Sequence, residues 1–257
     1  MDDKEYNVMP GIRRSDLWVI NTSPMHFKYR MDHEIESTPA LIFGQAMHKR
    51  LLEPLSFRDE FAVIPNVDRR SKAGKEAFDQ FKEENEFKTW ITEDQNEQIS
   101  EMIKALWLNE DVKQILMGDN RTEMPFSWID GETGEMCKVK SDILTYEGGK
   151  PTIIDYKTTK SCADGAFERD ARNYGYHFQA GMYCEGIDLC TLEQHEFIFI
   201  AQEKTPPYVS RVYRCDRDFI NAGRRKFHSL LRLYHECRMS DEWPGYPEET
   251  LYEERYD

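Results

Sequence analysis

The chain has 257 residues, and its 34 basic and 48 acidic residues give a formal net charge of −14 at pH 7. This length fits one large domain, or a domain with an appended subdomain, with a substantial core. No apolar run approaches the roughly 18 residues of a membrane span. The negative charge argues against nonspecific coating of DNA, although it is compatible with a local basic groove. The six cysteines are scattered without a C-x-x-C pair, which argues against zinc or an iron–sulfur cluster.

The cellular location is predicted from two features. The polar residues at the start of the chain do not have the pattern of a signal peptide. The cysteines are scattered, and an intracellular chain would keep them as thiols. We therefore expect a cytoplasmic protein that keeps its cysteines as thiols and does not associate with membranes.

The part of the chain up to residue 120 is predicted to be mainly helical. Residues 12–30 fit two short helices, with Ser23 as the N-cap of the second and Pro24 at its first position. The apolar periodicity predicts further helices over residues 38–54, 72–86 and 92–117.

His48 lies in the helix predicted over residues 38–54, four residues after Gly44 and therefore on the same side of it. Glycine permits the close approach of another backbone, and His48 then projects near that approach. A histidine on an apolar helix is most often a core residue with a hydrogen bond. A neutral imidazole is also a normal metal ligand, so both interpretations stay open at this point.

Four basic residues form the densest positive cluster of the chain: Arg69, Arg70, Lys72 and Lys75. Charge runs of this kind usually lie in solvated loops. They also provide contacts to the phosphates of nucleic acids. The second interpretation places this cluster at the mouth of a DNA-binding site.

Residues 121–240 are predicted to form a sheet with accompanying helices. Alternating or β-branched runs bounded by turn residues predict strands. These strands cover residues 122–130, 136–146, 152–158, 196–201 and 208–214, with a hairpin turn at 131–134. A final helix is predicted over residues 219–237, and a tail rich in acids and proline follows from residue 241 to 257.

Asp142 and Asp155 lie in two strands that are joined by a Glu-Gly-Gly turn. Lys157 follows Asp155 by two residues and so points to the same face of its strand. A buried carboxylate needs compensation. One interpretation is an ion pair with Lys157 or Lys140, and the other is a divalent metal held by both aspartates.

The segment after Lys157 predicts a helix from about Ala166 or Ala171 to Gly186. Gln179 and Tyr183 are four apart on it and share a face. For Tyr183 the usual outcome is packing with its hydroxyl at the surface. Gln179 favours a contact with a phosphate or a catalytic group.

Asp142 followed by Asp155-Tyr156-Lys157 resembles the signature of the PD-(D/E)XK nuclease superfamily, with Ser141 where that family usually has proline. Two further patterns resemble the RecB-like branch of the superfamily. These are the Gly-x-x-x-His pattern that ends at His48 and the Gln-x-x-x-Tyr pattern of residues 179–183.

Four segments in this order are similar to the RecE-like exonucleases of phages and prophages, the exonuclease VIII type. They are TPALIFGQAMH, RRSKAGK, KVKSD with IIDYKTT, and YGYHFQAGMY. The resemblance covers the chain from about Gly11 to Tyr213. It implies an α/β fold with a restriction-endonuclease-like core, in which helices flank a mixed central sheet and the N-terminal part adds helices.

The resemblance also implies an activity and partners. It implies Mg²⁺-dependent, 5′-to-3′ digestion of linear double-stranded DNA in phage-type recombination. It further implies a ring-shaped homo-oligomer and a RecT-type single-strand annealing partner.

A catalytic site follows from the resemblance and from general metal chemistry. Mg²⁺ prefers six oxygen ligands, and Mn²⁺ should substitute in a mixed nitrogen and oxygen site. The implied ligands are Asp142, Asp155, His48, the Tyr156 backbone carbonyl and Glu123. Lys157 would orient or deprotonate the attacking water, Gln179 would assist, and the basic cluster with Tyr183 would contact DNA.

Three other interpretations remain open on the sequence. The same core could be a single-strand or structure-specific endonuclease. The chain could also be a non-catalytic DNA-binding or assembly protein. Finally, it could be a structural α/β domain whose acids and lysine only pair with one another.

Overall fold

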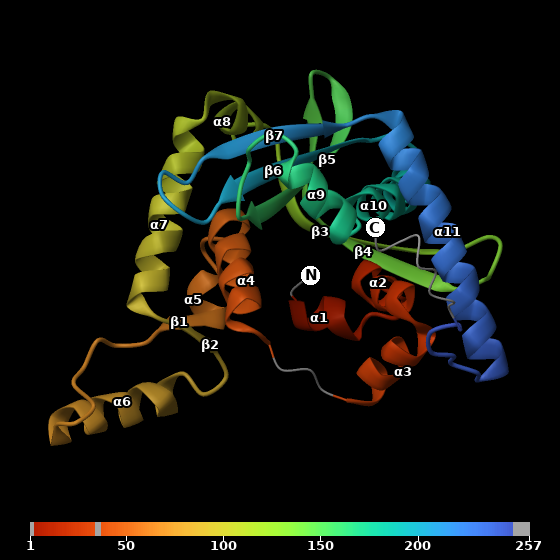
Figure 1. Ribbon diagram of the computed structural model, residues 1–257. Helices are drawn as coiled ribbons and strands as arrows, with labels where there is room; N and C mark the ends of the chain where they lie inside the picture. The colour runs from red at the N-terminus through yellow and green to blue at the C-terminus, as the bar shows by residue number, and fades with distance from the viewer. Residues whose placement is uncertain (1–2, 34–36, 249–257) are drawn as a thin grey trace, which may run out of the picture.

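The computed structural model describes residues 3–33 and 37–248 (Figure 1). The helices are α1 Asp3–Val8, α2 Arg14–Thr22, α3 Pro24–Asp32, α4 Pro39–Leu52, α5 Phe57–Glu60, α6 Lys72–Glu84, α7 Glu93–Leu108, α8 Glu110–Leu116, α9 Ala166–Asn173, α10 Tyr176–Thr191 and α11 Arg217–Ser240. The strands are β1 Phe61–Val63, β2 Thr89–Ile91, β3 Arg121–Ile129, β4 Met136–Glu147, β5 Lys150–Thr159, β6 Glu196–Glu203 and β7 Ser210–Cys215.

A five-stranded sheet in the order β3-β4-β5-β6-β7 forms the centre of the fold. All neighbouring pairs are antiparallel except β5 and β6, which run parallel. A parallel pair needs a crossover connection, and α9 with α10 provides it. The mixed α/β fold with a central sheet flanked by helices is confirmed.

Each face of the sheet carries its own apolar cluster. Ile153, Phe197 and Phe199 belong to the cluster that α2, α10 and α11 cover. Their neighbours Ile154 and Tyr156 belong to the cluster that α4, α7 and α8 cover. Because alternate residues of a strand point to opposite faces, β5 and β6 are buried on both sides.

Local capping explains several helix boundaries. The Ser23 side chain accepts a hydrogen bond from His26 N, so the predicted N-cap of α3 is confirmed. The helix predicted over 92–117 is interrupted after Leu108 and restarts at Glu110, because Asn109 accepts hydrogen bonds from Asp111 N and Val112 N as the N-cap of α8. The tail has neither helix nor strand over 242–248, and residues 249–257 lie outside the described part.

The helix predicted to reach Gly186 from Ala166 or Ala171 is two helices, α9 and α10, with a break at Gly175. Gly175 has φ = 65°, a conformation that favours glycine, and a Cβ there would lie 2.3 Å from the Trp18 ring. The Arg14 guanidinium donates to the carbonyl oxygens of Tyr174 and Gly175 at this break. A contact with α2, which is distant in the sequence, therefore sets the break.

The segment between residues 61 and 91 departs from the prediction most. Phe61–Val63 and Thr89–Ile91 pair as two short parallel strands, β1 and β2, which the sequence pattern did not predict. Between them, α6 projects away from the sheet (Figure 1). We call residues 64–88 the arm.

Within the described residues, no helix combines the length and the apolar character that crossing a bilayer requires.

Candidate active site

The predicted acids lie where two strands of the sheet separate. The pairing between β4 and β5 ends at Ile143 and Ile154. Asp142 and Asp155 are the next residues, and β5 continues alongside β6 alone up to Thr159. The Tyr156 N–H donates to Asp142 Oδ2 at 2.9 Å, so a side chain replaces a backbone partner. The fork therefore places two carboxylates between inner strands of the sheet.

Both β3 and β4 deform at this fork. Val139 and Ile143 are four residues apart, yet they belong to the clusters on opposite faces, so β4 reverses its side-chain orientation between them. On β3, Glu123 stands opposite Asp142 and has φ = 54°. A left-handed conformation at such a residue costs about 1–3 kcal/mol and tends to occur at functional sites.

Asp155 is almost fully buried, with 2% of its surface exposed. Its Oδ1 accepts a hydrogen bond from Gln179 Nε2 at 2.5 Å. Its Oδ2 lies 2.5 Å from Lys157 Nζ, but without hydrogen-bond geometry, and it accepts no hydrogen bond in the described part of the chain. Asp155 therefore keeps an oxygen that a cation can take.

Gln179 reaches Asp155 because α10 packs tightly on α11. A Cβ at Gly181 would lie 2.2 Å from Arg224 N, and a Cβ at Gly223 would lie 1.7 Å from His177 O. The two glycines therefore allow the backbones to touch. This contact fixes the position of α10 and so the height of Gln179 above the sheet.

His48 comes from α4, on the opposite face of the sheet. Its Nδ1 lies 3.4 Å from Asp142 Oδ2, and its ring packs edge-on against the Tyr156 ring at 5.3 Å between centroids. Ligand atoms of His48, Glu123 and Asp142 all lie within 4.8 Å of one another. The Lys140 ammonium pairs with Glu123.

The electrostatics of this group favour a cation. Burial, followed by repulsion from Asp155, raises the pKa of Asp142 to about 8. Burial and then Asp142 raise the pKa of Glu123. Burial and then Lys157 lower the pKa of His48, which keeps the imidazole neutral and able to ligate.

The donors fit a divalent metal ion. A neutral imidazole with carboxylates suits Mg²⁺ or Mn²⁺. The compact group is His48, Glu123 and Asp142. Asp155 lies outside this group, and its Oδ2 is paired with the Lys157 ammonium although it accepts no hydrogen bond in the described part of the chain. Ligation by the Tyr156 carbonyl stays a prediction.

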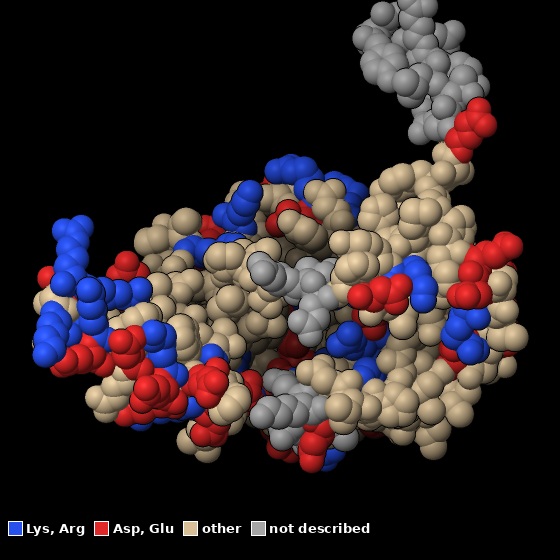
Figure 2. All heavy atoms as spheres, turned by 90° about the horizontal axis from the view of Figure 1, so that it is seen from below, with Lys and Arg blue, Asp and Glu red and all other residues tan. Residues whose placement is uncertain are grey.

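His48, Glu123 and Asp142 line a cleft of about 690 Å³, whereas Asp155 is buried behind it. Tyr6 of α1 forms part of one wall of the cleft, and Gly44 and His48 of α4 form part of another. Lys157 and Thr158 of β5 line it on the side of the sheet. Gly44 has no atom within 4 Å of the position a Cβ would take, so it leaves room in the cleft instead of receiving another backbone. Figure 2 shows the molecule hollowed near its centre, between the α4 side and the α1–α3 side.

A smaller hollow of about 370 Å³ adjoins the cleft at Thr158. Three cations line it, namely Arg14, Lys160 and Lys204. No motif in the sequence pointed to these three residues. They come from α2, from the end of β5 and from the β6–β7 connection, so no local pattern joins them.

The predicted DNA-binding residues are more dispersed. Tyr183 is partly buried near Asp155 and packs edge-on against Phe197 at 6.3 Å. None of the four basic residues 69, 70, 72 and 75 lines the cleft, because they lie on the arm. They therefore do not line the cleft itself, and their contact with DNA phosphates stays a prediction.

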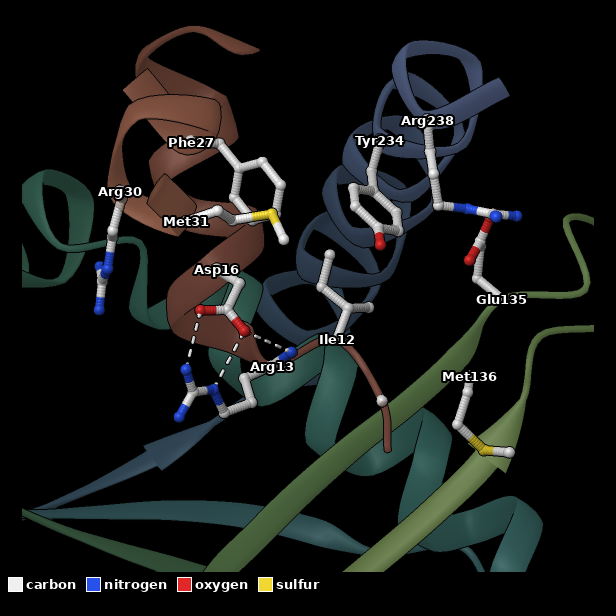
Figure 3. Close-up of a pocket in the computed structure, with 11 residues that line it drawn as sticks. Ile12, Arg13, Asp16, Phe27, Arg30, Met31, Glu135, Met136, Tyr234 and Arg238 are labelled. Carbon is white, nitrogen blue, oxygen red and sulfur yellow. Dashed lines mark hydrogen bonds and ion pairs between the residues drawn. The ribbon is translucent and has the colours of Figure 1, made fainter. Parts of the chain in front are cut away.

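Another hollow, of about 650 Å³, lies between α2, α3, α11 and the start of β4 (Figure 3). Its arginines are largely neutralised, since Arg13 pairs with Asp16 and Arg238 pairs with Glu135. Met136, which lines it, is about 20 Å along β4 from Asp142. We therefore separate this hollow from the acids of the fork.

The fork of acids with a nearby lysine, on a mixed sheet flanked by helices, defines a protein of the PD-(D/E)XK nuclease superfamily. Residues 14–255 match the family described as a PDDEXK-like domain of unknown function (DUF3799), and the chain belongs to this family. No curated protein shows significant sequence similarity to the chain.

One solved structure supports the fold. A crystal structure of a candidate exonuclease from Eubacterium rectale is similar over 98% of this chain and 96% of its own, with 15% identity and a TM-score of 0.66. The structure of SSO0001 aligns over 74% of this chain and 85% of its own, also with 15% identity. Its TM-score of 0.31 is too low to support an argument.

Proposed function

We propose that this nuclease is a metal-dependent exonuclease that digests linear double-stranded DNA in the 5′-to-3′ direction. The observation that carries the proposal is the fork, where Asp142 and Asp155 meet beside His48 and Lys157. The fold similarity to a candidate exonuclease supports the exonuclease type, and the RecE-like motifs support the substrate and the direction.

A divalent cation, Mg²⁺ or Mn²⁺, would be held by Asp142, Asp155, His48 and Glu123, with the Tyr156 carbonyl as a further ligand. Bound metal ions supply two effects, because they lower the pKa of water and neutralise charge on the phosphate. A two-metal arrangement, as the resemblance implies, would share these ligands.

The protein's own groups position and stabilise the reacting phosphate. The Lys157 ammonium, between Asp155 and the Tyr176 ring, carries a positive charge at the cleft. It would orient the attacking water and stabilise the charge that develops on the phosphate oxygens. Gln179 holds Asp155 in place by donating to its Oδ1.

The DNA strand would run from the cleft into the adjoining hollow. Arg14, Lys160 and Lys204 would there contact backbone phosphates, which positions the strand without reading its sequence. We also propose, on the RecE-like resemblance, a ring-shaped homo-oligomer and a RecT-type annealing partner. Sedimentation of the purified chain would detect the ring.

Digestion of end-labelled linear duplex beside closed circular DNA tests the activity, with Mg²⁺ or with a chelator. We expect Mg²⁺-dependent loss of linear DNA alone, with labels showing release from 5′ ends. Asp155→Ala should abolish it. Asp164→Ala is the matched control, because the Asp164 side chain is 93% exposed. Cutting of circles would instead establish an endonuclease, and inactivity on every DNA with each metal would refute the proposal.

A further inference from the structure

The arm contributes nothing to the core of the protein. Neither apolar cluster contains a residue from 64–88, although this whole segment is described. Within α6 only Gly74 is buried. A helix that adds so little burial has no evident structural purpose for the rest of the fold, so its exposed surface is where a function is to be sought.

The arm is nevertheless ordered and anchored. Phe81 packs edge-on against Trp90 at 5.3 Å between centroids, and the Trp90 indole donates to Asn85 O at 2.9 Å. At its root, Phe61 and Thr89 pair with each other and also line the catalytic cleft. These contacts tie the arm to β2 and, through Phe61 and Thr89, to one wall of the cleft.

The far end of the arm is a built turn that presents positive charge. Asp68 O accepts the Ser71 hydroxyl at 2.8 Å, and a Cβ at Gly74 would lie 2.0 Å from the same oxygen, so only glycine fits. Residues 68–75 hold four basic side chains and one acidic one, in a chain of net charge −14. Figure 2 shows lysine and arginine gathered at the tip of this end of the molecule, with acidic side chains next to them along α6.

The chemistry of this surface selects a polyanion over another protein. Protein interfaces have an apolar centre that is depleted of lysine, whereas phosphate contacts use lysine and arginine. Within the turn, Arg69 stacks on the Phe78 ring at 3.8 Å. The Lys72 side chain is 92% exposed and pairs with Glu76 at 3.8 Å, a loose contact at the surface.

We propose that the arm binds the backbone of the double-stranded part of the DNA, away from the cut. This inference rests on the proposed function. The 13 residues of α6 span about 20 Å, which corresponds to about six base pairs at 3.4 Å each. The arm thereby makes a duplex of at least this length the preferred substrate, because a shorter one does not reach the basic turn.

The test measures binding to DNA hairpins with stems of about 4, 8, 12 and 20 base pairs, in chelator so that nothing is cut. The variant Arg70→Ala/Lys72→Ala/Lys75→Ala leaves Arg69 on Phe78 and keeps good helix formers in α6. Lys28→Ala/Lys104→Ala/Lys113→Ala removes the same charge from surface sites elsewhere and is the matched control.

We expect wild type and control to bind more tightly as the stem grows past about six base pairs. The arm variant should lose this gain, about tenfold to a hundredfold at physiological salt, and its salt slope should fall by up to about 3. An unchanged length dependence or salt slope would overturn the inference, as would a changed oligomeric state with unchanged DNA binding. Failure of the proposed function appears separately, as the absence of Mg²⁺-dependent cutting by wild type.

Discussion

Replacing Asp142 with asparagine should stabilise the metal-free protein while destroying its activity. Asparagine keeps the shape of the side chain and an oxygen for the Tyr156 N–H, but it removes the charge that burial and Asp155 oppose. One pKa unit corresponds to 1.36 kcal/mol. A rise from 3.8 to about 8 therefore sets a ceiling of about 6 kcal/mol on the cost of ionising Asp142 in the folded state.

The expected increase in the free energy of unfolding is smaller, about 1–3 kcal/mol. The protein relaxes around a buried charge and water enters beside it, and both reduce the cost of that charge. The sign of the pH dependence is fixed. The folded-state pKa of Asp142 is raised, so the cost is absent near pH 4 and grows until about pH 8. In chelator, Asp142→Asn should therefore be more stable than wild type at pH 8 and equally stable at pH 4.

Urea unfolding of both proteins in chelator, at the two pH values, measures this difference. Asp188→Asn is the matched control, since Asp188 has similar exposure, 17% against 14%, but pairs with Arg224. That variant should lose stability. Equal or lower stability of Asp142→Asn at pH 8 would refute the reasoning, and so would the same gain at pH 4.

Three further substitutions test other parts of the site. Lys157→Ala should lower the cutting rate by about 10²–10³ while metal still raises the melting temperature, and an unchanged rate would remove Lys157 from the chemistry. His48→Ala should raise the Mg²⁺ concentration for half-maximal cutting about tenfold, and an unchanged titration would exclude it as a ligand. Gly181→Ala would place a Cβ 2.2 Å from Arg224 N, so thermal unfolding should show a loss of about 1–3 kcal/mol. Its cutting rate should also fall as Gln179 shifts, and full stability would contradict this packing.

The central sheet and the pairing of its acids could be predicted because the signals are local. Asp142 and Asp155 lie in strands joined by a tight turn, so a hairpin brings them together without distant contacts. Ser23 caps α3 through a bond to His26 only three residues away. Short-range geometry of this kind is written in the sequence itself.

The remaining features depend on contacts between distant segments. The break at Gly175 is set by Trp18 and Arg14, far away in the sequence. The strands β1 and β2 have three residues each, which is too short to show the alternating apolar pattern of a strand. They also pair across the whole length of the arm, so no tight turn marks them. The proximity of His48 to Asp142 could be predicted only from the family resemblance. The apolar periodicity of a helix does not tell which face of the sheet that helix covers.

The fork stands at the boundary of the two apolar clusters, and this position has a consequence for catalysis. Asp155 faces α10 and is held by Gln179, on one side of the sheet. His48 packs on Tyr156 on the other side and reaches Asp142 from there. The distance between the Asp142 and Asp155 carboxylates therefore depends on the packing of both clusters, because the two residues lie at the same fork but are held from opposite faces of the sheet. A substitution that loosens either core should move one half of the site relative to the other, even where it touches neither acid.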